Sequence, residues 1–159
     1  MDTALTSRLI GFIESIGIAV RAGPVAADSF MPGLRVHSGG IVYDPDRLAH
    51  PGDLLHEAGH IAVTDSAIRP MLATVSSDPG EEMAAIAWSY AALRAIGIDP
   101  AIVFHEDGYQ GGGSVIAENF ANGHYFGVPL LEWFGMAATA REAESTGVAR
   151  FPDMQRWLR

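Results

Sequence analysis

The sequence predicts one α+β domain that is mostly helical and carries a small antiparallel sheet. The chain has 159 residues, about the length of a single domain, and it is 48% hydrophobic with only 18% charged residues, which is typical of a compact globular protein. Apolar residues recur at helical spacing near the N-terminus and in the middle of the chain, and short alternating stretches around a glycine pair lie between them. This distribution favours helices packed beside a small sheet.

The first 45 residues are expected to form one helix and the sheet. Residues 3–16 place apolar side chains at near-helical spacing and are followed by Gly17, which predicts the first helix. The segment 18–23 (IAVRAG) predicts a short strand. The segment 33–45 (GLRVHSGGIVYDP) predicts a hairpin that turns at its SGG sequence, because glycine tolerates the backbone conformation of tight turns.

The middle of the chain predicts two longer helices. Residues 50–65 (HPGDLLHEAGHIAVTD) place Pro51 and Asp53 where a first helical turn favours a proline and a carboxylate. Residues 78–97 (DPGEEMAAIAWSYAALRAIG) have a proline and two acids near their start and a glycine at their end, as helices commonly do. Both segments are apolar on nearly all sides, so both are expected in the core.

Glycines and prolines divide residues 99–159 into short helical stretches. We expect residues 1–98 to form the recognisable core of a single domain, 1–159, and residues 99–159 to be a helical C-terminal extension whose role the sequence does not define. The apolar stretches VPLLEWFGMAA and FPDMQRWLR either pack in the core or bind a second copy of the chain or another protein.

Composition excludes several classes of protein. No cysteine is present, so disulfides, thiolate metal sites and cysteine nucleophiles are excluded, and histidine and carboxylate are the good metal ligands that remain. The net charge is −9 and every basic residue is an arginine, without the clustered cations that nucleic-acid binding needs. The sequence has neither the layout of a signal peptide nor an apolar run of membrane-spanning length. We therefore expect a cytoplasmic protein that binds neither nucleic acid nor membrane.

The stretch LLHEAGHIAV, residues 54–63, contains the motif HExxH. On a helix, positions four apart lie on one face, so His56 and His60 can direct ring nitrogens at one zinc ion. Glu57 follows the first ligand, where it can reach a water on the metal and act as general base. The alternative is a pair of ordinary histidines with a salt-bridging glutamate. The apolar flanks argue against this alternative, because buried polar groups without partners are costly.

A zinc site of this kind needs a third protein ligand, and a catalytic site leaves the fourth position for water. The long metzincin pattern would need glycine at position 63 and histidine at position 66, where this chain has Val63 and Ser66. The next predicted helix offers Glu81 and Glu82. Periodicity does not decide between them, and acids are common in first helical turns for their effect on the helix dipole alone.

An N-terminal helix is followed by IGIAVRAG, GGIVYDP, LLHEAGHIAV and EEMAAIAWSYAA, over roughly residues 3–95. This order resembles the ImmA/IrrE-type zinc metallopeptidase domain, a compact gluzincin. The resemblance implies a zincin-like fold with an HExxH active-site helix, in which His56 and His60 bind Zn²⁺ and Glu57 is the catalytic acid and base. In that family a glutamate precedes a run of small residues and an aromatic. EMAAIAW fits this pattern and favours Glu82 as the third ligand.

A second polar stretch, FHEDGYQGGGSVIAENFANGHYFGVP, lies in the C-terminal part. Its candidate donors for the oxyanion of a tetrahedral intermediate are His105 first and Tyr109 second, ahead of His124 and Tyr125; a histidine at a helix end is also commonly a cap or a surface group. The GYQGGGS loop is either a lid beside the site or a plain connector, and without a lysine it is no phosphate-binding Walker loop. Three acids are spare ligand candidates only: Glu106, Asp107 and Glu118.

The sequence therefore predicts a zinc-dependent metallopeptidase that hydrolyses peptide bonds in a peptide or protein substrate. Zn²⁺ held by His56, His60 and Glu82 would polarise the carbonyl and activate a water whose proton Glu57 takes. The segment GGIVYD, residues 39–44, is expected either to bind substrate as an edge strand or only to stabilise the fold. Two alternatives remain: a non-catalytic zinc-binding interaction or regulatory module, and a zinc hydrolase of a non-peptide amide.

Overall fold

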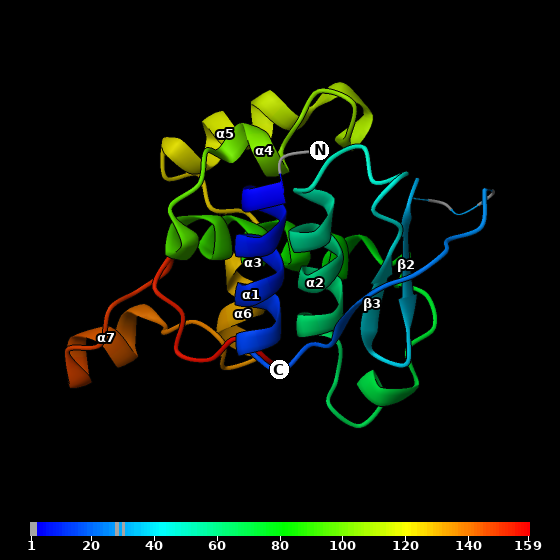
Figure 1. Cartoon of the computed structure of the whole chain (residues 1–159). Coiled ribbons are helices and arrows are strands. Elements are labelled where there is room, and N and C mark those ends of the chain that lie inside the picture. The colour runs from blue at the N-terminus through cyan, green and yellow to red at the C-terminus, as the bar shows by residue number, and fades with distance from the viewer. Residues whose placement is uncertain (1–2, 28, 30) are drawn as a thin grey trace.

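Helices form most of the regular secondary structure, and a small sheet lies to one side of them (Figure 1). The computed structural model describes residues 3–27, 29 and 31–159. Within these residues it contains seven α-helices, two short 3-10 helices and one mixed sheet of three strands. The predicted α+β class is therefore confirmed. No helix in this part of the chain is long and apolar enough to cross a membrane.

The N-terminal elements follow the prediction closely. They are α1 (Thr3–Ser15), β1 (Val20–Ala22), β2 (Leu34–His37) and β3 (Gly40–Tyr43). Ser38 and Gly39 make the two-residue turn between β2 and β3, and their φ angles of 51° and 70° are both positive. Such a turn matches the twist of a tight hairpin and favours glycine. The predicted first helix, short strand and hairpin are therefore confirmed.

The sheet is mixed, which corrects the prediction of an antiparallel one. Strands β2 and β3 pair antiparallel, but β1 pairs with β3 in parallel, and the strand order is β1-β3-β2. The connection after β1 leads to β2 at the opposite edge of the sheet. The second strand of the hairpin, β3, then lies between β1 and β2. The segment 39–44 thus holds the central strand, whose backbone is paired on both sides. It does not offer the free edge expected of a substrate-binding strand.

Helices α2 (Asp53–Val63) and α3 (Pro79–Ile96) lie side by side at the centre of the molecule (Figure 1). Helix α2 begins at Asp53, so Pro51, which was predicted in its first turn, lies in the turn before it. Helix α3 begins after Asp78, whose carboxylate accepts hydrogen bonds from two backbone N–H groups, and ends at Gly97 in the left-handed conformation, a common helix terminus.

The two central helices pack closely because the residues between them are small. A Cβ at position 59 of α2 would lie 2.9 Å from the carbonyl oxygen of Ala85 and 3.1 Å from Ser89 Oγ on α3. Gly59 therefore sets the distance between the helices. Trp88 and Tyr90 fill volume around them and are buried, as the sequence predicted.

Residues 99–159 close the core. The short helices there are α4 (Pro100–Val103), α5 (Gly113–Ala121), α6 (Val128–Trp133) and α7 (Ala140–Thr146), with the 3-10 helix η2 (Tyr109–Gly111). The other 3-10 helix, η1 (Arg69–Met71), lies between α2 and α3. Phe104, Phe120 and Phe151 belong to the same buried cluster as the central helices. The C-terminus lies near the end of α1 (Figure 1). Both C-terminal apolar stretches pack partly in this core. Trp133, in the first stretch, is an exception because it is 84% exposed.

Candidate metal centre

Three residues predicted as metal ligands converge where α2 meets α3. His56 and His60 lie one turn apart on α2, and Glu82 lies in the first turn of α3. The Nε2 atoms of the two histidines are 3.2 Å apart. The Glu82 carboxylate oxygens lie 3.6 Å from His56 Nε2 and 3.0 Å from His60 Nε2. Among the described residues, these three side chains form one of two groups that could hold a metal ion.

The separations between these atoms fit a tetrahedral ion. With bonds of about 2.0–2.1 Å from the metal to nitrogen and oxygen, neighbouring ligand atoms lie about 3.3 Å apart. The two histidine nitrogens are 3.2 Å apart, and each lies 3.0 or 3.6 Å from a different oxygen of Glu82, so the observed separations are close to this value. The two imidazole planes meet at 81°, so the rings approach from different directions. The three side chains would need little movement to hold an ion.

The protonation states of the group also suit metal ligands. Burial lowers the pKa of His56 to about 4, and the nearby His60 adds to this effect. A hydrogen bond with His60 holds the pKa of the Glu82 carboxyl below its usual value, although burial acts in the opposite direction. At neutral pH the group therefore contains a neutral imidazole and a carboxylate, the forms that bind metals. The Nδ1 atoms of both histidines are buried without a hydrogen-bond partner among the described residues.

Glu57 lies beside this group without belonging to it. Its side chain is buried and borders the same cleft. Burial raises the pKa of Glu57 to about 7; His60 opposes this shift, and the carboxylates of Asp53 and Glu82 add to it. A carboxyl with a pKa near 7 can both accept and donate a proton at neutral pH. The position of Glu57 therefore suits proton transfer.

A cleft of about 990 Å³ exposes the group to solvent. The helices α2 and α3 provide the candidate ligands, and three other segments supply most of the remaining lining: strand β2, the segment 73–77 and the loop 107–110. Glu82 is the most accessible of the three candidate ligands, with 42% of its side chain exposed, whereas the His60 side chain is only 4% exposed. The group can therefore be approached from the side of Glu82.

Strand β2 borders the cleft through residues 34–36 and is an edge strand of the sheet. The Asp44 N–H donates to the carbonyl of Gly33, and hydrogen-bonded pairs alternate along an antiparallel ladder. The ladder register therefore directs the N–H and C=O of Val36 away from β3, whereas at Leu34 the outer edge of β2 is already occupied by Met31 and by the Ser29 hydroxyl.

Tyr109 lies over the candidate ligands, on the loop between α4 and α5. Its ring packs edge-on against His56, with 5.2 Å between ring centroids, and it lines the cleft. Tyr109 and Gln110 have φ angles of 53° and 56°, a conformation that costs non-glycine residues about 1–3 kcal/mol each. Burial raises the pKa of the Tyr109 phenol far above its usual value, and nearby carboxylates, Glu82 first, raise it further. The hydroxyl thus stays protonated and can donate a hydrogen bond.

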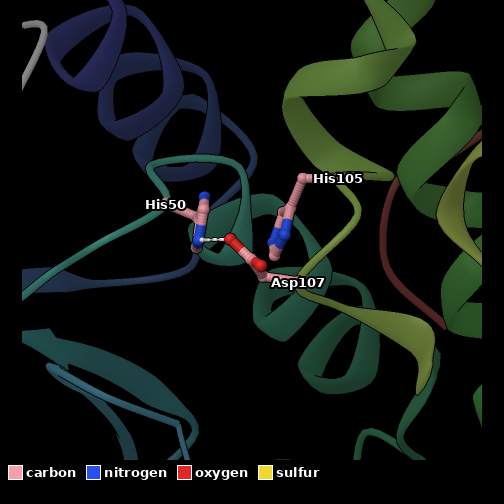
Figure 2. A group of neighbouring side chains, drawn as sticks. All are labelled: His50, His105 and Asp107. Carbon is pink, nitrogen blue, oxygen red and sulfur yellow. Dashed lines mark ion pairs between the residues drawn. The ribbon is translucent and has the colours of Figure 1, made fainter. Parts of the chain in front are cut away.

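His105 does not line the cleft. Its Nε2 lies 2.8 Å from Asp53 Oδ1, and its ring stacks on that of His50 with 3.8 Å between centroids. Figure 2 shows the two rings facing each other beside Asp107. Of the two candidate oxyanion donors, only Tyr109 borders the cleft.

The other sequence candidates are not members of this ligand group. His124 is exposed, and Tyr125 packs against Phe120 and Phe151. Glu106 and Glu118 are exposed, and Asp107 forms an ion pair with His50. The backbone N–H of Glu81 belongs to the N-cap of α3, and its side chain is outside the ligand group. The structure therefore places Glu82, and not Glu81, in the candidate ligand group, a choice that the periodicity of the sequence left open.

Asp53 is a residue of the cleft whose place there the sequence analysis missed. It is buried, lines the cleft and binds His105. From the sequence, Asp53 was predicted only to be a favourable charge at a helix start. The available signal was its spacing, because Asp53 precedes Glu57 by one helical turn and must share its face.

Comparison of the chain with models of protein families, with curated proteins and with solved structures finds no match. Its function must therefore be inferred from the residues of the cleft. Those residues combine a group able to hold a metal, a buried carboxyl with a pKa near 7 and a phenol donor.

Proposed function

We propose that this protein is a zinc-dependent metallopeptidase with a zincin-like fold of the gluzincin type. The main support is the arrangement of His56, His60 and Glu82, whose ligand atoms have the separations expected around tetrahedral zinc. The resemblance of the sequence to ImmA/IrrE-type domains points to the same three residues. Within the described residues, the group contains three candidate ligands. A catalytic zinc site has three protein ligands and an open position, whereas a structural site closes all four.

The reaction would be hydrolysis of a peptide bond by water. His56, His60 and Glu82 would hold the zinc ion, which when bound supplies positive charge to polarise a carbonyl and to lower the pKa of water. The Glu57 carboxylate accepts the proton of the attacking water and passes it to the leaving amine as the C–N bond breaks. The pKa of about 7 that burial gives Glu57 in the metal-free protein suits a group that must accept and then donate.

Tyr109 and β2 would position the substrate. The protonated Tyr109 hydroxyl donates a hydrogen bond to the carbonyl oxygen as negative charge develops on it. Strand β2 would bind an extended peptide backbone at the sheet edge, through the backbone groups of Val36 that point away from β3. Both elements border the cleft. An open cleft with a backbone-binding edge suits a peptide or an extended protein segment.

Metal content tests the ligand set. Zinc per chain is measured by mass spectrometry on protein purified without added metal. We expect His60→Ala and Glu82→Gln to hold about one zinc fewer than wild type, because each loses a ligand of the group. Glu81→Gln is the matched control, since it changes the neighbouring acid on the same turn, and it should keep the wild-type content. A wild type that binds no zinc, or equal losses in Glu81→Gln and Glu82→Gln, would show that the ligand set is wrong.

Turnover tests the reaction. Wild type and Glu57→Gln, both loaded with zinc, are incubated with a broad peptide library, and cleavage is followed by mass spectrometry. We expect Glu57→Gln to keep its zinc and to lose about 10²–10⁴-fold in activity, the usual contribution of a general base. Zinc binding without any turnover would favour the non-catalytic zinc-binding module. Cleavage of small amides but of no peptide would favour the hydrolase of non-peptide amides.

A further inference from the structure

A second group of histidine and carboxylate side chains lies outside the candidate metal centre. It contains His50, His105 and Asp107, whose ligand atoms all lie within 4.8 Å of one another. His50 belongs to the segment just before α2, and the other two residues follow α4, so the group joins parts of the chain that are far apart in sequence (Figure 2). His50 Nε2 lies 3.1 Å from Asp107 Oδ2. The group shares no residue with the first.

The surroundings of His105 are those of a metal ligand. Its Nε2 lies 2.8 Å from Asp53 Oδ1, and both side chains are nearly buried. A metal-binding histidine usually donates its second ring N–H to a carboxylate in this way, which fixes the tautomer and leaves the other nitrogen free to bind. The other nitrogen of His105, Nδ1, is buried and has no hydrogen-bond partner among the described residues. A buried ring nitrogen without a partner is rare and calls for a ligand or a water.

The donors identify the class of ion. Two imidazoles and one carboxylate suit divalent first-row transition metals such as zinc, whereas calcium and magnesium prefer oxygen ligands alone. The group is also open to solvent on one side, because the Asp107 side chain is 80% exposed. An ion could therefore enter without unfolding of the chain.

The second group is less prepared for an ion than the first. Its ligand atoms are within 4.8 Å of one another, compared with about 3.3 Å around a tetrahedral ion. The rings of His50 and His105 are stacked at an interplanar angle of only 11°, and an imidazole binds a metal in the plane of its ring. Binding therefore requires His50, the more exposed ring at 34% of its side chain, to rotate away from the stack. This rearrangement makes the affinity lower than that of the first group.

We infer that His50, His105 and Asp107 form a second, weaker site for a divalent transition-metal ion. An ion there links the start of α2 to the loop that carries Tyr109. Tyr109 is two residues beyond Asp107 and packs on His56, so occupancy of the second site restrains the residue that covers the first. The inference requires only that this group bind metal, and it does not depend on the proposed peptidase activity.

Stoichiometry tests the second site. The whole chain is dialysed against buffered free Zn²⁺ over a range of concentrations, and bound zinc is measured by mass spectrometry. We expect wild type to reach about two zinc ions per chain in two separate steps, and His50→Ala and Asp107→Asn to reach about one. His124→Ala is the matched control, because His124 is an exposed histidine outside both groups, and it should bind like wild type. His60→Ala should lose the tighter step and keep the weaker one.

This experiment can reject the second site without rejecting the first. A wild type that saturates with one zinc, which His60→Ala loses and His50→Ala keeps, overturns the second site and leaves the first intact. Equal losses in His50→Ala and His124→Ala would show adventitious binding to surface histidines and would also overturn it. Thermal unfolding gives an independent measure, since a ligand that binds only the folded state raises Tm. Raising free zinc beyond saturation of the first step should raise Tm further in wild type and not in His50→Ala.

Discussion

Burial controls the charge of the residues in HEAGH. Burial lowers the pKa of His56 to about 4 and raises the pKa of Glu57 to about 7, so both shifts favour the uncharged side chain. The motif can therefore be enclosed in an apolar core without placing unpaired charges there. At neutral pH the imidazole is ready to act as a ligand, while Glu57 is close to its point of ionisation.

We expect Glu57→Gln to stabilise the metal-free protein above neutral pH. Glu57 ionises near pH 4.5 when unfolded and near pH 7 when folded. Between these values the folded state holds a proton that the unfolded state has lost, so the contribution of Glu57 to stability falls as pH rises through this window. Glutamine has no such charge, so its advantage over glutamate should approach about 3 kcal/mol at pH 8.

Urea unfolding of chelator-treated wild type and Glu57→Gln, at pH 4.5, 6 and 8, measures this difference. His56 acts in the opposite direction, because its folded pKa of about 4 lies below its unfolded value of 6.5, and its contribution to stability is lost as pH falls through that window. It is present in both proteins and cancels in the comparison. A difference that does not change with pH would contradict the shifted pKa of Glu57.

The hydroxyl of Tyr109 is expected to matter for turnover and not for metal binding. Tyr109→Phe keeps the ring that packs on His56 and Phe104 and removes only the hydrogen-bond donor. Loss of one oxyanion donor lowers kcat by about 10²-fold or more. The measurement is the cleavage rate of a peptide found in the library digest, together with zinc content, which should not change. Unchanged kcat would show that Tyr109 only packs.

At the scale of the elements, the spacing of α2 and α3 determines the geometry of the centre. Gly59→Ala would place a Cβ 2.9 Å from the Ala85 carbonyl oxygen, a backbone atom that can move only with its helix. We expect a loss of about 1–3 kcal/mol in stability from this overpacking. Zinc affinity should also fall, because the same displacement moves His60 away from Glu82.

Urea unfolding of the metal-free protein and a zinc competition titration measure the two effects of Gly59→Ala. The matched control is Gly11→Ala, since Gly11 lies within the exposed face of α1 and a Cβ there meets nothing within 4 Å. Alanine favours the helix over glycine by about 0.5–1 kcal/mol, so this control should be slightly more stable and bind zinc normally. If both substitutions had the same effect, helix spacing would not explain the result.

Local signals predicted the elements that depend on local interactions. The hairpin followed from its SGG turn, and the limits of α3 followed from its proline, acids and final glycine, because turns and helix ends are set by nearby residues. The pairing of β1 could not be predicted in this way. Which hairpin strand lies next to β1 depends on the path of an eleven-residue connection, 23–33, and on burial against α2, neither of which the sequence of β1 specifies.

At the scale of the whole molecule, the same contrast separates the two metal-ligand groups. His56 and His60 were predicted because four residues on one helix have a known geometry. The prediction of Glu82 depended on the resemblance to a known family, because Glu82 lies on another helix. His50 was not considered, and Asp107 was only a spare ligand, because their neighbours come from the other half of the chain. Contacts between segments that are distant in the chain produce no periodic pattern of residues from which they could be predicted.

The last nine residues connect the C-terminal part to the core, and Trp157 is their main contact. Its ring centroid lies 5.0 Å from that of Phe12 and 5.5 Å from that of Trp88, and its carbonyl accepts the Trp88 indole N–H. We expect Trp157→Ala to cost about 2–4 kcal/mol, since it removes a large ring from between two helices. Trp133→Ala is the control, because Trp133 is 84% exposed, and it should change stability by less than about 0.5 kcal/mol. Urea unfolding of both variants measures this difference. Equal effects would show that the Trp157 ring contributes no more to stability than an exposed tryptophan. A selective loss in Trp157→Ala would show that the last residues belong to the cooperative core.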